Sequence, residues 1–249
     1  MAVHDFKSQR LFLNAVLRQG ESIETTREQA NYLINVLRLR TGAKILVFNG
    51  RDGEWAAELQ VFGRKKCSLI PETQTRSQPK PSNLIYCFSP LKQARLDYMV
   101  QKAVEMGVGV LQPIVTQYTQ VRNINEKRLA ANAVEAAEQC GILNIPEIRQ
   151  TISLKEIANL IDENTRLYFC DEEAADASAT VGPSIKRAQS MALLIGPEGG
   201  FSPEERQFVK ALPNVVLLGL GPRILRADTA AIAALAVIQS NFGDWYQKE

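Results

Sequence analysis

The fold is decided by one stretch of the chain, Met191-Ala-Leu-Leu-Ile-Gly-Pro-Glu-Gly-Gly-Phe-Ser-Pro-Glu-Glu205. It begins with an apolar run typical of a buried strand, passes through a glycine-rich turn and ends in a predicted helix. The start of that helix is well defined, because Ser202 at the N-cap, Pro203 at the first helical position and Glu205 at the third form a capping box. A strand, a turn and a helix in this order are typical of an α/β domain.

A second glycine-rich turn follows the next predicted strand, in Val215-Val-Leu-Leu-Gly-Leu-Gly-Pro-Arg-Ile-Leu-Arg-Ala-Asp-Thr-Ala-Ala-Ile-Ala-Ala-Leu235. In the first turn, Gly196, Gly199 and Gly200 let a ligand approach main-chain amides, because no Cβ stands in the way. Ligands of open α/β sheets bind beyond the carboxyl ends of the strands, where both turns lie. The first turn matches neither GxxxxGK[ST] nor GxGxxG, which argues against a phosphate loop and a dinucleotide turn. Two glycine turns in succession favour a binding site over purely structural turns.

The chain after residue 83 alternates apolar strands with amphipathic helices, as expected of a mostly parallel sheet. Further strands are predicted at Leu84–Phe88, Val110–Ile114, Arg166–Cys170 and Val215–Leu218. Helices are predicted near Glu126–Cys140, Leu154–Ile161, Pro203–Ala211 and Thr229–Phe242, and one more carries Leu96, Met99, Val100, Ala103 and Val104 on its apolar face.

The front of the chain differs from the rest in charge and in predicted structure. Residues 1–80 hold 13 Lys and Arg against 8 Asp and Glu, which leaves 16 against 19 of the totals of 29 and 27 for the remainder. This excess of cations favours a polyanionic partner, with an ordinary solvated surface as the alternative. Residues 73–83 have no apolar side chain except prolines and are expected to form a linker. Before it, a small β-barrel is predicted from one helix at Arg27–Val36 and strands at Arg10–Leu13, Lys44–Phe48, Glu54–Val61 and Lys66–Ile70.

Composition argues against metal and membrane functions. No histidine cluster completes a zinc site, and the four cysteines stand far apart, at Cys67, Cys87, Cys140 and Cys170. No apolar stretch reaches the roughly 20 residues that span a bilayer, and the first residues lack the continuous apolar core of a signal peptide. We therefore expect a cytoplasmic protein without a metal.

The paired glycine turns, GPEGG and LGLGPRILRADTA, resemble the C-terminal motifs of the SPOUT superfamily of RNA methyltransferases. More specifically, the chain resembles the bacterial family that methylates N3 of a uridine in 16S ribosomal RNA. The match extends to LKQARLDYMVQKAVEMGV (Leu91–Val108), AVEAAEQCG (Ala133–Gly141), SQRLFL (Ser8–Leu13) and NVLRLRTGAKILVFNG (Asn35–Gly50). Two departures stand out, since a usual histidine is replaced around Asn31 and Tyr32, and Ile142 occupies the place of a usual arginine.

The resemblance implies an α/β fold in which a SPOUT-type, trefoil-knotted domain over residues 84–249 follows a PUA-like β-barrel, RNA-binding domain over residues 1–72. It implies S-adenosyl-L-methionine as the methyl donor, held by the two glycine turns. The residues themselves favour a pocket of main-chain amides and apolar side chains, although each leucine alone has a core role as its alternative. The predicted donor-binding residues are Leu194, Gly196, Pro197, Glu198, Gly199, Gly200, Leu218, Gly219, Leu220 and Leu225.

The predicted catalytic residues are charged side chains beside these turns. Methylation of uracil N3 requires loss of the imide proton, and a guanidinium from Arg223 or Arg226 would stabilise the anion. A general base is harder to assign, with Glu198 and Asp228 as carboxylate candidates and helix capping as the alternative role of Asp228. In the basic front domain, the residues predicted to hold RNA phosphates are Arg10, Arg38 and Arg40.

The expected partner is 16S ribosomal RNA within the small ribosomal subunit. The apolar, alanine-rich last helix must be buried, either inside one domain or across a two-fold interface, and the resemblance favours a homodimer. One alternative function is a SPOUT ribose 2′-O-methyltransferase of transfer or ribosomal RNA. Another is an RNA-binding assembly factor without catalysis, against which the intact glycine turns and Arg226 argue.

Overall fold

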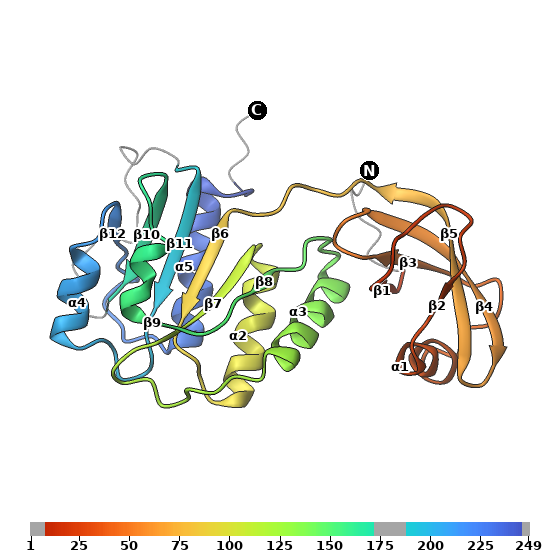
Figure 1. The fold of residues 1–249 in the computed structure, drawn as a ribbon, viewed down its shortest axis with the longest axis horizontal. Helices are drawn as coiled ribbons and strands as arrows, with labels where there is room; N and C mark the ends of the chain where they lie inside the picture. Colours follow the sequence, from red (N-terminus) through yellow and green to blue (C-terminus); the bar gives the residue numbers. More distant parts are fainter. Residues whose placement is uncertain (1–7, 172–187, 246–249) are drawn as a thin grey trace. The chain divides into compact units, whose positions relative to one another are not determined.

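The computed structural model describes residues 8–171 and 188–245 and divides into two compact units (Figure 1). The first unit comprises Met1–Pro81 and Ala137–Ile145, and the second comprises Ser82–Ala136 and Pro146–Glu249. Each has its own apolar core, the first around Leu13, Val47 and Leu59 and the second around Phe169 and Leu194. A segment distant in sequence therefore completes the first unit.

The first unit is built on a five-stranded sheet with the order β1-β3-β4-β5-β2. Its strands are β1 (Arg10–Phe12), β2 (Ile23–Glu24), β3 (Lys44–Phe48), β4 (Glu54–Gly63) and β5 (Lys66–Arg76). Only the β1–β3 pair is parallel among these described strands. Helix α1 (Arg27–Asn31) starts at a capping box formed by Thr26 and Gln29, and a π-helical turn (Tyr32–Val36) continues it.

Strand β5 extends beyond its predicted end, so the linker predicted over residues 73–83 is wrong for residues 73–76. The extension has a cause, because Thr75 and Arg76 both donate hydrogen bonds to the carboxylate of Glu54 on β4. Farther along, the Gln78 Nε2 donates to the Asn144 Oδ1 at 2.7 Å. The polar stretch is therefore held by side-chain hydrogen bonds that its composition did not reveal.

A buried ion cluster ties the first unit together. Arg10 and Arg76 both bind the Glu54 carboxylate, at 3.0 and 2.6 Å, and the Glu54 side chain is only 3% exposed. Burial by itself raises the pKa of Glu54, but the hydrogen bonds from Arg76, Thr75 and Arg10 outweigh it and hold the pKa below its ordinary value. Arg76 also donates to the carbonyl of Gly141 at 2.9 Å, which fixes the 137–145 segment in this unit.

The second unit contains a parallel sheet with the order β12-β10-β11-β6-β7-β8, to which β9 is added beside β7. Its strands are β6 (Leu84–Phe88), β7 (Val110–Val115), β8 (Glu147–Ile148), β9 (Ile152–Ser153), β10 (Thr165–Cys170), β11 (Ser190–Ile195) and β12 (Val215–Leu217). Its helical segments are α2 (Gln93–Glu105), α3 (Glu126–Cys140) except for its last residues 137–140, which belong to the first unit, a 3₁₀ turn (Leu154–Asn159), α4 (Pro203–Lys210) and α5 (Ala227–Phe242). The predicted parallel-sheet α/β domain is thus confirmed.

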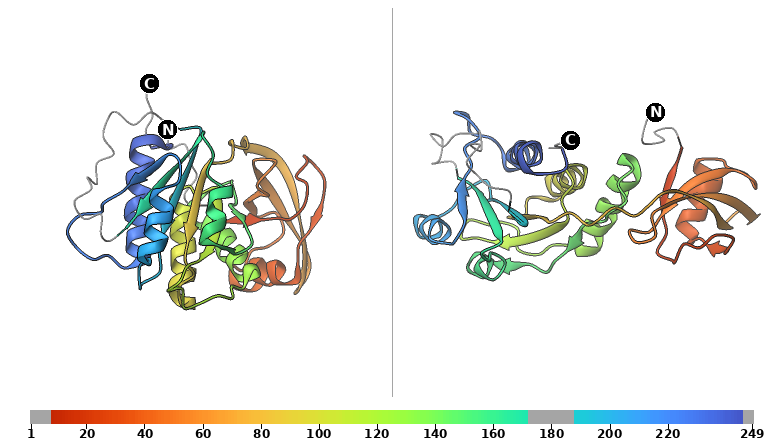
Figure 2. Two further views of the ribbon diagram at one scale, coloured as in Figure 1. Left: turned by 60° about the vertical axis from the view of Figure 1, so that its left-hand side comes forward. Right: turned by 90° about the horizontal axis from the view of Figure 1, so that it is seen from above.

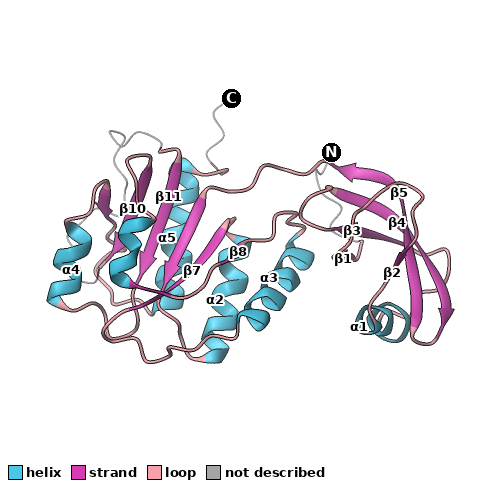
Figure 3. Ribbon diagram, viewed as in Figure 1, coloured by secondary structure: helices cyan, strands magenta, loops and turns pink. Residues whose placement is uncertain are grey.

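Helices cover both faces of this sheet, as Figures 2 and 3 show. Adjacent residues of β10 point to opposite faces. Tyr168 stacks on Phe242 of α5 with ring centroids 5.9 Å apart, whereas Phe169 meets Phe201 edge-on at 5.0 Å. Helix α5 is buried against α2 and β11, as its apolar sequence predicts. None of the helices in the described ranges is long and apolar enough to cross a bilayer.

Candidate functional site

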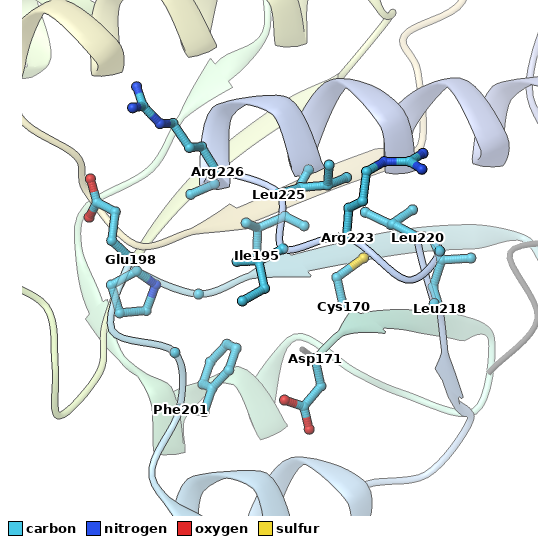
Figure 4. A pocket seen from close by; sticks show the side chains of 18 of the residues that line it. Cys170, Asp171, Ile195, Glu198, Phe201, Leu218, Leu220, Arg223, Leu225 and Arg226 are labelled. Carbon is cyan, nitrogen blue, oxygen red and sulfur yellow. The ribbon is translucent and has the colours of Figure 1, made fainter. Parts of the chain in front are cut away.

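A cavity of about 420 Å³ lies at the carboxyl ends of β10, β11 and β12 (Figure 4). These strands are parallel neighbours, so their carboxyl ends open onto the same edge of the sheet. The volume falls within the roughly 300–1,000 Å³ that is usual for small-molecule sites. The lining residues are Cys170, Asp171, Ile195, Gly196, Pro197, Glu198, Gly200, Phe201, Leu218, Gly219, Leu220, Gly221, Pro222, Arg223, Ile224, Leu225, Arg226, Ala227 and Ala230.

One wall of the cavity is the glycine turn after β11. A Cβ on Gly196 would stand 2.5 Å from the ring of Phe201, so only glycine fits beside that ring. Gly200 has a φ of +69°, and its amide donates to the carbonyl of Pro197 at 2.9 Å. The turn then leads into α4, whose predicted capping box is present: the Ser202 hydroxyl and the Glu205 carboxylate each accept an amide hydrogen bond from the other residue. Contacts and hydrogen bonds between residues close in the sequence therefore hold this wall in place.

The opposite wall is the loop between β12 and α5. Leu218 extends the strand pairing by donating its amide to the carbonyl of Phe169 at 3.0 Å, and Gly221 then turns the chain with a φ of +89°. Leu220 and Leu225 line the cavity, and Ala230 adds a small side chain from the first turns of α5. Helix α5 begins at Ala227, two residues before its predicted start. Both predicted glycine turns thus meet in one apolar cavity.

Sequence reasoning missed the contribution of β10. Cys170 and Asp171 lie at its carboxyl end, between the two glycine turns, because β10 is the neighbour of both β11 and β12 in the sheet. Burial raises the pKa of the Cys170 thiol to about 12, so it is protonated at neutral pH. The buried Asp171 carboxylate accepts a hydrogen bond from Arg206 at 2.9 Å and lies 3.5 Å from the Lys210 Nζ. No motif in the sequence of β10 marks these two residues. Only the order of the strands in the sheet places them in the cavity.

Three predicted residues lie outside the cavity lining. Leu194 is fully buried in the core beneath it. Gly199 faces Tyr118 instead, since a Cβ at this position would lie 3.1 Å from the Cβ of Tyr118. The Asp228 Oδ1 accepts the amide hydrogen of Thr229 at 2.9 Å in the first turn of α5, where its charge complements the helix dipole. The N-cap of α5 is Arg226 and makes no side-chain cap hydrogen bond, so Asp228 is not the capping residue, and its catalytic role stays a prediction.

Three of the four charged residues predicted for catalysis stand at the rim. Arg223, Arg226 and Glu198 all line the cavity. Figure 4 shows Arg226 on the same side as Glu198 and Arg223 on the other. The Glu198 carboxylate already accepts a hydrogen bond from the Arg95 guanidinium at 2.9 Å, and both side chains are more than one-third exposed. The result is an apolar cavity with guanidinium groups around its opening.

The three arginines predicted to bind RNA have different environments. The prediction that Arg10 binds RNA is wrong. Its side chain is 5% exposed and bound to Glu54, so it is not available to a phosphate. Arg38 and Arg40 are exposed. Arg38 has a φ of +56°, a left-handed conformation that is uncommon for a residue with a Cβ. His4, the single histidine of the sequence, lies outside the described residues.

Two family models match the chain. The model described as an RNA methyltransferase domain matches residues 78–239, and the model described as an RNA methyltransferase PUA domain matches residues 25–72. The first covers the whole cavity. The second lies within the first unit.

Relatives and solved structures agree with these models. The chain is 30% identical to the ribosomal RNA small subunit methyltransferase E of Rickettsia conorii over 94% of this chain and 96% of the relative. For the protein of the same name from Bacillus subtilis, the identity is 27% over 92% and 95%.

A methyltransferase of Legionella pneumophila in complex with bound cofactor SAM has a TM-score of 0.85 at 29% identity, with 96% of this chain and 99% of that one covered. A ribosomal RNA small subunit methyltransferase E of Neisseria gonorrhoeae bound to S-adenosyl methionine has a TM-score of 0.86 at 26% identity over the same shares. The predicted fold class, a SPOUT-type α/β domain preceded by a PUA-like domain, is confirmed.

Proposed function

The chain belongs to the RNA methyltransferase family, and from this premise we propose that it transfers a methyl group from S-adenosyl-L-methionine to N3 of a uridine in 16S ribosomal RNA. It is a ribosomal RNA methyltransferase that depends on S-adenosylmethionine. The observation that carries the proposal is the meeting of the two glycine turns in one apolar cavity with arginines at its opening.

The cavity residues fit the donor by their chemistry. Ile195, Leu218, Leu220 and Leu225 offer apolar surface to an adenine ring, and the glycines leave main-chain amides open to its polar edge. We assign donor binding to the lining residues of both turns and remove Leu194 and Gly199 from contact. Leu194 supports the floor from the core, and Gly199 allows the turn to pass Tyr118.

The donor, when bound, supplies an electrophilic methyl group on a positively charged sulfur. For N3 to accept it, the uracil imide must lose a proton, and negative charge spreads over the two flanking carbonyl oxygens. Arg226 and Arg223 would hold positive charge where this anion develops. Glu198 binds Arg95, so its first role is to position that part of the rim, and the general base stays unassigned.

RNA binding and assembly complete the proposal. Arg38 and Arg40 supply exposed positive charge in the first unit, whose family model is a PUA domain. Helix α5 keeps Ile232 and Val237 partly exposed, which supports a homodimer formed across this helix. We propose that the substrate is the small ribosomal subunit in the cytoplasm, and that the loops around the cavity form the trefoil knot.

The test is to incubate the protein with methyl-labelled S-adenosylmethionine and small subunits from cells that lack the gene, and then to separate the nucleosides. We expect the label in 3-methyluridine at a single position. Label in a 2′-O-methylated nucleoside would favour the ribose methyltransferase instead. Donor binding without transfer to small subunits, free 16S RNA or transfer RNA would contradict the proposed function.

A further inference from the structure

Two short segments of the first unit expose apolar side chains. Phe62, at the end of β4, is 61% exposed, and so is Val36, at the end of the π-helical turn. A single exposed apolar residue on a protein surface needs no explanation. These two lie on segments that are joined to each other, and each is followed two residues later by an arginine, Arg38 or Arg64.

Hydrogen bonds hold the two segments together. The Asn35 Nδ2 donates to the carbonyl of Arg64 at 3.2 Å, within the turn that joins β4 to β5. The Val61 amide donates to the Thr41 Oγ1 at 3.0 Å. Residues 35–41 and 61–66 therefore form one surface, called here the tip surface.

The tip surface is strongly basic. Its residues include Arg38, Arg40, Arg64, Lys65 and Lys66 and no Asp or Glu. Lys66 pairs with Glu24 at 3.0 Å, but both side chains are well over half exposed, so this pair is weak and open to exchange. A polyanion is the partner that this charge favours.

The backbone of the tip surface shows that its shape is costly. Arg38 adopts a φ of +56° just after Leu37, the C-cap of the π-helical turn, where a glycine would carry less strain. Strained backbone and π-helical turns concentrate at functional sites. The strain presents a guanidinium on a surface that already carries an exposed aromatic ring.

We propose that the tip surface binds an unpaired stretch of RNA, with one base stacked on the Phe62 ring and the flanking phosphates bound by Arg38, Arg64 and Lys65. Aromatic rings bind single strands by stacking, and a paired base in a helix leaves no face free for this contact. The ring therefore selects unpaired over paired RNA, which charge alone would not do. The inference rests on the proposed function for the identity of the polyanion.

The experiment measures binding of a fluorescent 12-nucleotide oligouridine, the same sugar-phosphate chain without bases, and a 12-base-pair RNA duplex by the full-length protein. Phe62→Ala should weaken oligouridine binding about five-fold or more, because one stacked base loses its partner. It should leave binding of the base-free chain, the salt dependence and donor affinity unchanged. Phe62→Trp should restore binding, and stacking should quench the fluorescence of the new tryptophan. Val16→Ala, which truncates another half-exposed apolar residue of the same unit, is the matched control.

Replacing Arg64 and Lys65 together with alanine should act differently. It should weaken binding of all three ligands and lower the salt slope by about 0.7 for each single-strand phosphate that the protein no longer neutralises. The proposal is overturned if Phe62→Ala binds oligouridine like the wild type, or if it weakens the base-free chain equally. It is also overturned if Phe62→Ala instead alters self-association in sedimentation, since Phe62 would then be a contact between copies. Methyl transfer is measured in a separate assay. The binding experiment therefore still tests the tip surface if the proposed activity is not found.

Discussion

At the scale of single residues, the arginines of this chain divide into those that hold the fold and those that remain open to a ligand. Arg10 and Arg76 bind Glu54 inside the first unit, whereas Arg223 and Arg226 line the cavity of the second. The sequence alone does not distinguish the two kinds of arginine, because the side chain is the same in both. The difference lies in the partners that the fold brings within reach.

Arg226→Ala should lower the rate of methyl transfer by about a hundred-fold or more while it changes donor affinity little. The reason is that its proposed partner, the charge on the uracil, develops only in the transition state. Single-turnover kinetics and calorimetry with S-adenosylmethionine separate the two quantities. Arg122→Ala, an exposed arginine outside the cavity lining, is the control. Equal losses in rate and in donor affinity would remove Arg226 from the catalytic proposal.

Glu54→Gln should destabilise the first unit by about 3 kcal/mol, because two arginines would lose their buried carboxylate. The pH dependence follows from the lowered pKa of Glu54. Its contribution is complete above the ordinary glutamate value of about 4.3 and is lost as the pH falls through the lower, folded-state pKa. Urea unfolding between pH 7 and pH 3 should therefore show a smaller acid loss in the variant than in the wild type. Identical acid profiles would contradict this account.

Arg38→Gly should stabilise the first unit by about 0.5 to 1 kcal/mol, since glycine tolerates the left-handed backbone better even after its entropic cost. The same change should weaken RNA binding and reduce its salt slope by about 0.7. Thermal unfolding and RNA titrations at several salt concentrations measure both effects. A variant that is less stable, or that binds RNA as tightly as before, would show that the strain serves no RNA contact.

At the scale of elements, the cavity is a product of three parallel strands that end at one edge of a sheet. Two of them continue into glycine turns and the third into a buried carboxylate. Helix α5 contributes Ala230 to the cavity lining, where a larger side chain would fill part of the cavity.

Ala230→Leu should abolish donor binding without unfolding the protein, because leucine suits a helix and projects from this position into the cavity. Ala233→Leu is the matched control, about one helical turn farther along, partly exposed and outside the lining. Calorimetry with S-adenosylmethionine and circular dichroism give the two readouts. Wild-type affinity in a folded Ala230→Leu protein would show that the donor binds elsewhere.

The elements were predicted well where their signals are local. Apolar runs, capping residues and glycine turns identified both walls of the cavity, including the N-cap of α4 at Ser202. The missed strands β2, β8 and β9 have two residues each and carry no periodic pattern. Cys170 and Asp171 were missed, and Arg10 was misplaced, because their surroundings are set by strands and side chains far away in the sequence.

At the scale of the whole molecule, the two units each have their own core, and the cavity belongs to the second. S-adenosylmethionine at about 100 times its Kd should therefore stabilise the second unit by about 2.7 kcal/mol. Hydrogen exchange followed by mass spectrometry should show slower exchange in β10, β11 and α5 and little change in β3 and β4. Equal protection of both units would mean that they unfold as one.

The first unit is not a continuous stretch of the chain. Its residues 137–145 arrive after more than fifty residues of the second unit, and they supply the carbonyl of Gly141 to Arg76 and the amide oxygen of Asn144 to Gln78. A single genetic crossover within residues 77–83 would carry away a first unit that lacks these partners. Recombination could transfer the whole first unit only with two further breakpoints, one before residue 137 and one after residue 145. Because the two units are interleaved in the sequence, we expect them to be inherited together. Exchange of residues 1–81 alone would remove the hydrogen-bond partners that residues 137–145 supply to the first unit.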